Sequence, residues 1–397
     1  MSRARYAAVM ADRLADWLQA VDALYPQNHA ASWDSTGLQV GDPDDPVRGV
    51  LLCLDVVAAT LDEAAARGAD LLLAHHPLLF RPLDRLTVAT VSGRLALQAA
   101  RSRIAVLAAH TNFDSAVDGT TEPVVRLLGL GEVTPLAPAA PGDGDCKLVT
   151  FVPPEATQRV RSALTAAGAG TIGAYRECSF QVRGTGTFEA TAGANPAVGQ
   201  RGRRNEVVED RLEMVVPQGR LSAAVAALRH AHPYEEVAYD VLRLLGATDA
   251  GRGMGRVGDL AAPLALGTIG QRLAVGLPSP HLRVGGDPHR PIRRVAACGG
   301  AGDALIGAAL DAGADCYITG DLRHHVALDA RSAGMAVIDA GHYATEAAAL
   351  PLLQQALAQA ASRRGLTARL LASAVRTDPW QIHPGGGWDT GLDKGAP

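Results

Sequence analysis

Residues 49–77 read GVLLCLDVVAATLDEAAARGADLLLAHHP, and this stretch decides the fold. An apolar run of strand length is followed by a helical pattern that ends at Gly68 and then by a second apolar run. Short apolar runs without alternation are typical of strands that are buried on both faces. A strand, a helix and a second strand in this order predict a parallel βαβ unit with its helix packed on the sheet.

The same alternation of strand and helix continues on both sides of a central segment. It extends over residues 92–110 and returns over residues 293–362. We therefore predict an α/β fold with a discontinuous core, in which a mainly parallel sheet has helices on both faces. Pro351 lies inside the last helical pattern and predicts a kink or a late helix start, because proline lacks a backbone N–H.

The central segment has a different pattern. Its order of strand, helix, strand, strand, helix and strand predicts an inserted ferredoxin-like α+β domain. The flanks, residues 137–145 and 251–259, are rich in Pro and Gly, as expected of linkers. The predicted domains are 1–140 (first half of the α/β core), 146–248 (insertion), 255–373 (second half of the core) and 374–397 (a loosely held Gly-rich tail).

Composition limits the class of protein. Of 397 residues, 48% are hydrophobic and 20% charged, which excludes a disordered chain. The formal charge of −4 argues against a nucleic-acid partner, since such binding needs a concentrated basic face. No run of about 18 apolar residues and no apolar signal core are present, so we expect a cytoplasmic protein without a membrane partner. The five cysteines form no CxxC pair, which argues against a zinc–thiolate site or a disulfide framework.

Histidines follow the ends of predicted strands. His75 and His76 come directly after the apolar run 71–74, His110 ends the strand pattern 103–110, and His342 ends 335–342. The carboxyl ends of strands are the edge where open α/β sheets place their ligand sites. A carboxylate lies four residues after each of the last two histidines, as Asp114 and Glu346. Imidazole and carboxylate together suit zinc, manganese, iron or nickel.

Each motif also has a simpler interpretation when taken alone. HTNFD (110–114) could be a turn with local side chain–backbone hydrogen bonds, and GHYATE (341–346) could be a helix start capped by Thr345. The adjacent pair at 75–76 is harder to explain in this way. Three such motifs at carboxyl strand ends together favour a metal site.

Five stretches of the sequence belong together with these histidines: WDSTGLQVGD (33–42), LLLAHHPLLF (71–80), HTNFD (110–114), GDLRHH (320–325) and DAGHYATE (339–346). As a set, these motifs resemble the Nif-three-like dinuclear-metal family, whose bacterial members are often labelled GTP cyclohydrolase I type 2 homologues. The resemblance covers about residues 10–373, and HPYEEVAYDV (232–241) is similar to the insertion of the longer members. One departure is Ser35, where the family commonly has Asn.

The resemblance implies a ligand set and an assembly. It implies that His75 and Asp114 bind a first metal, that His76 and His342 bind a second, and that Glu346 is shared by both. It also implies two divalent ions per subunit with open coordination positions, in a homohexamer shaped as a hollow toroid. The remaining histidines near the predicted site are candidates for a general acid or base, or for orienting and packing roles: His110, His324 and His325.

We therefore expect a metal-dependent hydrolase acting on a nucleotide or another phosphorylated small molecule. Two metals would polarise the electrophile and lower the pKa of a bridging water. The GTP cyclohydrolase label is one version of this activity, but no pattern in the sequence indicates specific recognition of guanine. The alternative is a non-catalytic metal-binding or metal-handling protein that uses its insertion as a regulatory or interaction module.

Overall fold

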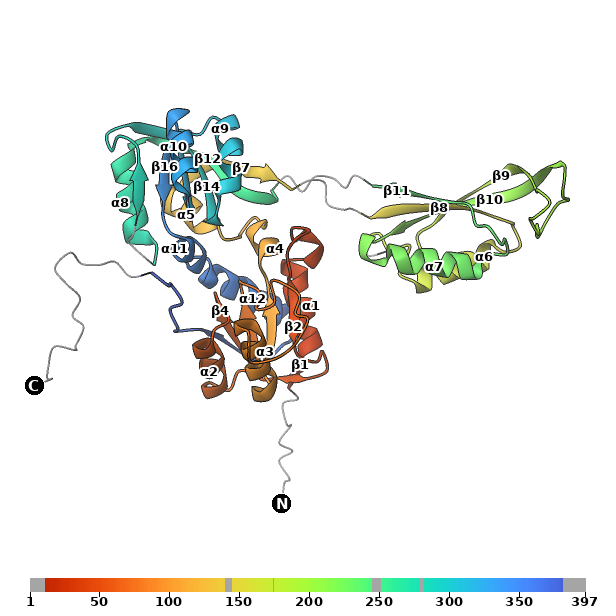
Figure 1. The fold of residues 1–397 in the computed structure, drawn as a ribbon, viewed down its shortest axis with the longest axis horizontal. Coiled ribbons are helices and arrows are strands. Elements are labelled where there is room, and N and C mark those ends of the chain that lie inside the picture. Colours follow the sequence, from red (N-terminus) through yellow and green to blue (C-terminus); the bar gives the residue numbers. More distant parts are fainter. Residues whose placement is uncertain (1–10, 140–144, 174, 245–250, 279–281, 381–397) are drawn as a thin grey trace, which may run out of the picture. The chain divides into compact units, whose positions relative to one another are not determined.

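A computed structural model describes residues 11–139, 145–173, 175–244, 251–278 and 282–380. Residues 1–139 and 250–397 form one compact unit, which we call the core unit, and residues 140–249 form the inserted unit (Figure 1). None of the helices within the described ranges combines the length and the apolar character needed to cross a bilayer.

The core unit contains two large sheets within the described ranges. The first has the order β17-β4-β5-β6-β2, in which β2 is antiparallel to β6 and the other neighbours are parallel. The βαβ unit predicted from residues 49–77 lies within it as β4, α2 and β5. The first sheet and its neighbouring helices comprise β2 (Gly37–Val40), β4 (Gly49–Cys53), α2 (Ala58–Ala66), β5 (Leu71–Ala74), α3 (Val91–Ser102), β6 (Ala105–Ala108) and β17 (Arg369–Ala372). A separate two-stranded sheet pairs β1 (Asp12–Arg13) with β3 (Pro46–Val47).

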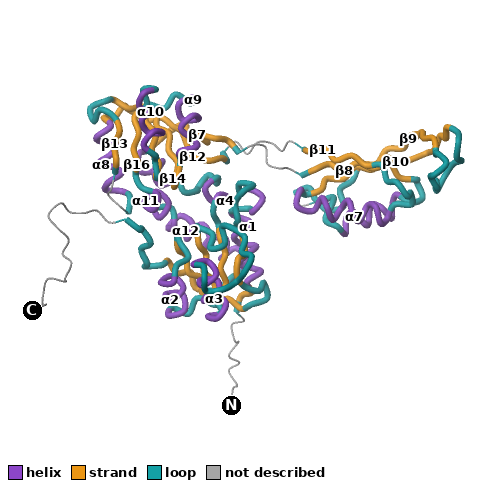
Figure 2. Tube along the Cα trace, viewed as in Figure 1, coloured by secondary structure: helices purple, strands orange, loops and turns teal. Residues whose placement is uncertain are grey.

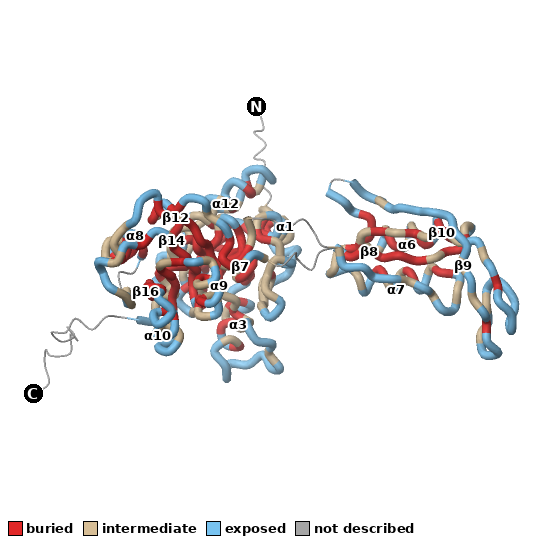
Figure 3. Tube along the Cα trace, turned by 90° about the horizontal axis from the view of Figure 1, so that it is seen from above, coloured by how far each residue is buried: buried red, intermediate tan, exposed pale blue. Residues whose placement is uncertain are grey.

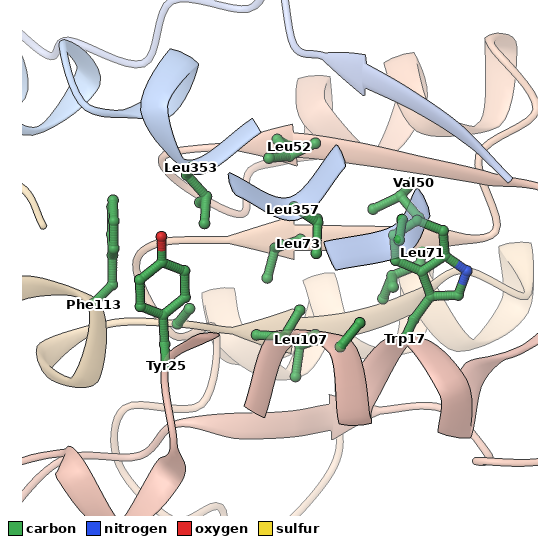
Figure 4. Close-up of a cluster of buried hydrophobic side chains, with 14 of the residues drawn as sticks. Trp17, Tyr25, Val50, Leu52, Leu71, Leu73, Leu107, Phe113, Leu353 and Leu357 are labelled. Atoms are coloured by element: carbon green, nitrogen blue, oxygen red, sulfur yellow. The ribbon is translucent and has the colours of Figure 1, made fainter. Parts of the chain in front are cut away.

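The three central strands of the first sheet, β4, β5 and β6, are buried on both faces, which explains their uninterrupted apolar sequences. Figure 3 colours the buried residues of the core unit red. Leu52 points to the face covered by α1 (Leu14–Leu24) and α12 (Leu350–Arg364), where Trp17 is also buried (Figure 4). Leu51 points to the opposite face, which packs against α2 and α3. Successive residues of a strand face opposite sides, so each strand contributes to two cores.

The last helix crosses to the first sheet. The helical pattern 344–362 is divided into α11 (His342–Ala347) and α12, with Pro351 in the first turn of α12. Leu353 and Leu357 of α12 are fully buried in the core over the first sheet, and β17 pairs with β4. The helix α12 and the strand β17, which belong to the predicted second half of the core, therefore complete the first sheet and its hydrophobic core.

The second sheet has the order β13-β16-β15-β14-β12-β7. Only the pairs β14–β15 and β15–β16 are parallel, whereas the other three are antiparallel. The α/β class is confirmed. The predicted mainly parallel arrangement holds for the first sheet, but three of the five strand pairs in the second sheet are antiparallel, because β7, β12 and β13 pair in the antiparallel sense. The elements of this half are α4 (Thr111–Asp114), α5 (Glu122–Leu128), β7 (Leu130–Pro138), β12 (Gly253–Ala265), α8 (Leu266–Gly276), β13 (Arg283–Gly285), β14 (Pro291–Ala301), α9 (Ile306–Asp311), β15 (Cys316–Gly320), α10 (His324–Ser332) and β16 (Ala336–Asp339).

The inserted unit has its own sheet and core (Figure 2). Its strand order is β11-β8-β10-β9, and all neighbours are antiparallel. Leu148 and Leu212 of the sheet are buried together with Leu164 and Leu228 of the two helices. Its elements are β8 (Cys146–Val152), α6 (Thr157–Ala166), β9 (Phe180–Glu189), β10 (Arg204–Val216), α7 (Leu221–Ala231) and β11 (Tyr239–Arg243).

The insertion begins and ends at the tip of a hairpin in the core unit. Pro138 of β7 pairs with Gly253 of β12, and the N–H of Ala139 donates to the carbonyl oxygen of Arg252 at 3.0 Å. The points where the chain leaves and re-enters the core unit are thus hydrogen-bonded neighbours. A short turn is enough to join them.

Replacing residues 140–251 with an Asn-Gly turn is expected to leave a folded core unit that binds metal. The two units have separate cores, and the Asn-Gly pair closes tight antiparallel hairpins. Circular dichroism of the shortened protein would measure its folding, and elemental analysis would measure its metal content. An unfolded product without metal would show that the insertion is integral to the core.

The predicted tail is partly fixed to the first sheet. The N–H of Ala374 donates to Glu63 at 3.0 Å, and the hydroxyl of Thr377 donates to Asp55. Residues 374–377 of the predicted tail are therefore held by hydrogen bonds to polar groups of α2 and of the segment after β4. Residues 381–397 of the predicted tail lie outside the described residues.

Candidate metal centre

The predicted ligands follow the strands of both large sheets. His75 and His76 come directly after β5, and Asp114 lies in α4, after the neighbouring parallel strand β6. His342 and Glu346 lie in α11, which follows β16 of the second sheet. The two strand ends of the first sheet and α11 therefore meet between the sheets of the core unit.

Glu346 lies at the centre of this cluster. Its Oε1 is 3.5 Å from Nε2 of His75, whereas its Oε2 is 2.9 Å from Nε2 of His76 and 3.1 Å from Nε2 of His342. The side chain is 4% exposed. Gly300 of β14 makes room for it, since a Cβ there would overlap Oε1 of Glu346 and the φ of +67° favours glycine.

Three overlapping groups of side chains could hold a metal ion, and all five predicted ligands belong to them. Asp114 completes the cluster on the side of His75, with 3.5 Å between Oδ1 and Nε2, and accepts a hydrogen bond from the hydroxyl of Thr120 at 2.6 Å. The groups are His75 with Asp114 and Glu346, His76 with His342 and Glu346, and His75 with His76 and His110.

The other ring nitrogen of each ligand histidine has a fixed partner. Nδ1 of His75 is 2.9 Å from a backbone carbonyl oxygen just after β6. Nδ1 of His76 is 2.7 Å from Asp55, and Nδ1 of His342 is 2.8 Å from Asp321. These contacts favour the tautomer with the proton on Nδ1, so the lone pair of Nε2 faces the cluster.

The sequence did not reveal Asp55 and Asp321 as members of the site. Each follows a strand directly or within two residues, Asp55 after β4 and Asp321 after β15. Asp321 has a φ of 55°, a left-handed conformation that is uncommon for residues other than glycine and clusters at functional sites. Their position at carboxyl strand ends was the available signal.

The carboxylates raise the pKa values of the imidazoles. Burial alone would lower the pKa of His76, but hydrogen bonds to Asp55 and Glu346 raise it to about 10. Burial also opposes protonation of His342, and Glu346 and Asp321 raise its pKa to about 9. Burial would raise the pKa of Glu346, but the charge of His75 and hydrogen bonds from the imidazoles hold it well below its usual range. A bound cation would replace these protons, so metal affinity should increase with pH.

Two atoms at the centre of the cluster fit a metal ligand set. When the imidazoles are neutral and protonated on Nδ1, Nε2 of His75 and Oε2 of Glu346 are buried without a hydrogen-bond partner among the described residues, although they lie within ion-pair distance of their neighbours. Buried polar atoms without partners are costly unless another group meets them. Imidazole nitrogens and carboxylate oxygens directed to one interior point suit a borderline divalent cation.

His110 lies beside the cluster. Its ring centroid is 5.1 Å from that of His75 and 5.5 Å from that of His76. Nδ1 of His110 is 2.8 Å from Asp34, whose other oxygen accepts from the backbone N–H of Thr111 at 3.0 Å. Although burial opposes it, the hydrogen bonds from His110 and Thr111 hold the pKa of Asp34 below its usual range. Asp34 therefore fixes the orientation of His110.

The structure does not bring His324 and His325 into the cluster. Both are exposed at the start of α10, with their ring centroids 5.1 Å apart. Neither belongs to any of the three groups of ligating atoms found among the described residues. The positions of these two histidines therefore do not support a role for either of them as general acid or base.

Comparisons with known proteins find similar chains over most of this sequence. A family model described as Duf34/NIF3 (NGG1p interacting factor 3) matches residues 13–379. A Mycobacterium tuberculosis protein named "GTP cyclohydrolase 1 type 2 homolog" is 41% identical over 97% of this chain and 100% of its own length. A Bacillus subtilis protein of the same name is 40% identical over 82% of this chain and 87% of its own. The crystal structure of a Bacillus cereus protein related to NIF3 superimposes with a TM-score of 0.66, at 35% identity, over 94% of this chain and all of that one.

Proposed function

The chain belongs to the Duf34/NIF3 family, and from that membership and the cluster around Glu346 we propose a dinuclear-metal-dependent hydrolase of a nucleotide or another phosphorylated small molecule. The name shared by the relatives, which refers to GTP cyclohydrolase, supports hydrolytic chemistry as the class of reaction. The groups of His and carboxylate side chains support the dependence on metal.

One observation carries the proposal of two ions. The two oxygens of Glu346 face different imidazoles, Oε1 facing His75 and Oε2 facing His76 and His342. A carboxylate in this position can serve two neighbouring cations at once and reduce their mutual repulsion. We assign His75 and Asp114 to one ion, His76 and His342 to the other, and Glu346 to both.

The residues around the proposed ligands have different roles. Two divalent ions, when bound, would supply Lewis acidity and lower the pKa of water. Asp55 and Asp321 orient the imidazoles of His76 and His342 through Nδ1. His110 has its Nδ1 held by Asp34, so its Nε2 is the atom available to hold or transfer a proton.

Two further assignments concern fold and assembly. We assign the inserted unit to the ferredoxin-like architecture, which is supported by its antiparallel order β11-β8-β10-β9 with helices in two connections. We also propose the homohexamer that the family resemblance implies. Light scattering on the purified protein would measure its mass as a multiple of that of one chain.

A substrate screen tests the proposed function. The full-length protein, loaded in turn with zinc, manganese, iron and nickel, would be incubated with nucleoside mono- and triphosphates and with simple phosphoesters. We expect turnover that depends on the metal, stops on chelation and returns when metal is restored. Metal transfer to a chelator or partner, with no turnover for any loaded form, would favour the metal-handling alternative.

A further inference from the structure

Two exposed aromatic side chains lie together beside the metal centre. Trp33 is 62% exposed and Phe80 45% exposed, with ring centroids 6.0 Å apart and ring planes at 68°. Aromatic residues make up only 4% of the chain, and Trp17 and Phe113 are fully buried in the core. A paired, exposed Trp and Phe is therefore a specific feature of this surface, and such features mark binding sites.

His110 connects this pair to the ligands. Its ring centroid is 6.3 Å from Trp33 and 6.2 Å from Phe80, and both pairs meet edge to face. On its other side, His110 contacts the rings of His75 and His76. A small molecule that reaches the metal centre past His110 would therefore pass Trp33 and Phe80.

The aromatic pair is held in place by polar contacts. Gln39 joins the two loops, since its side-chain amide donates to the carbonyl oxygen of Ser35 at 2.7 Å and its Oε1 accepts from the N–H of Leu79 at 2.8 Å. Asp34, next to Trp33, is fixed by His110 and Thr111. A binding surface that is ordered before the ligand arrives loses less entropy on binding.

We propose that Trp33 and Phe80 bind a planar heteroaromatic ring of the substrate and so position its reacting group at the metal centre. This inference rests on the proposed function and adds to it the residues that recognise the ring. Stacking of a nucleobase on an aromatic side chain changes affinity by roughly five- to 150-fold and requires no particular base, because every base has a π-face.

Binding of two ligands that differ only in the ring tests the proposal. Adenosine 5′-monophosphate and ribose 5-phosphate carry the same phosphate, so their affinity ratio isolates the base. Calorimetry on the metal-loaded full-length protein should give at least about fivefold tighter binding of the nucleotide. Trp33→Ala should abolish this ratio, and Trp33→Phe should retain much of it. Because Trp33 is largely exposed, its removal should leave the melting temperature unchanged.

Trp380→Ala is the matched control. Trp380 is 74% exposed and borders a cavity of about 990 Å³ that also reaches His76 and His342. Loss of the ratio in Trp380→Ala, with Trp33→Ala unchanged, would overturn the proposal and place the ring in that cavity. Equal affinity for both ligands, no binding of either, or a change of assembly alone in Trp33→Ala would also overturn it.

Catalysis and ring recognition can fail separately. If the nucleotide binds more tightly through Trp33 but no substrate is hydrolysed, the ring site stands and the hydrolase function does not. If hydrolysis is observed and Trp33→Ala leaves both KM and the affinity ratio unchanged, the function stands and the ring site is wrong.

Discussion

Glu346→Gln is expected to lower the metal affinity of both positions by more than about a hundredfold. The substitution keeps the size of the side chain but removes the charge that faces His75 on one side and His76 and His342 on the other. Loss of an outer partner of a metal ligand already costs about 10- to 100-fold in affinity, and Glu346 is assigned as a direct ligand of two ions. Elemental analysis after dialysis would measure the metal content of each chain.

Glu122→Gln provides the comparison for this variant. Glu122 forms a surface ion pair with Arg126, one helical turn away, so Glu122→Gln also replaces a charged carboxylate with an amide. This variant should keep the metal content of the wild type. Unchanged far-ultraviolet circular dichroism in both variants would exclude unfolding as the cause. Full metal content in Glu346→Gln would refute the assignment of a shared carboxylate.

His76→Ala is expected to reduce hydrolysis by about a thousandfold or more at matched metal loading. His76 is assigned to the second ion, and its removal also leaves Asp55 without its imidazole partner. Loss of a well-aligned reacting group typically costs several kcal/mol of transition-state stabilisation, and each 1.36 kcal/mol corresponds to about tenfold in rate. Asp114→Asn, on the side of the first ion, should have an effect of similar size.

His324→Ala serves as the reference for the loss of a histidine. His324 is exposed in α10 and belongs to none of the ligating groups among the described residues, so its variant should retain the wild-type rate. Steady-state rates of the wild type and the three variants would be compared with the substrate found in the screen. Equal rates in all four proteins would mean that another site or a contaminant performs the hydrolysis.

The cluster of candidate ligands could be predicted because its residues lie at the ends of predicted strands and within one helical turn. The apolar run of β5 stops at His75, and Pro77 ends the extended segment. The spacing of His342 and Glu346 is that of one helical turn, and α11 places both side chains in the same group of ligating atoms. These signals depend on residues close in sequence, which is why they could be recognised.

The partners of the ligands and the division into two sheets depend on distant residues. The chain has 41 Asp and Glu residues, and the position of Asp55 and Asp321 after predicted strands does not show by itself which imidazole each one contacts. The pairing of β7 with β12 spans the whole insertion, and no periodicity encodes it. The packing of α12 on the first sheet was equally hidden, because its apolar pattern fits either half of the core.

The return of α12 and β17 to the first sheet affects how the protein is made. His76 and His342 are 266 residues apart, and a ribosome adds about 5–20 residues each second. For tens of seconds, the nascent β4 therefore lacks both its neighbour β17 and the helix that covers Leu52. The inserted unit has its own core and can fold during that interval. Chaperones should consequently bind the emerging amino-terminal half, and the proposed set of five ligands is complete only after α11 has been translated.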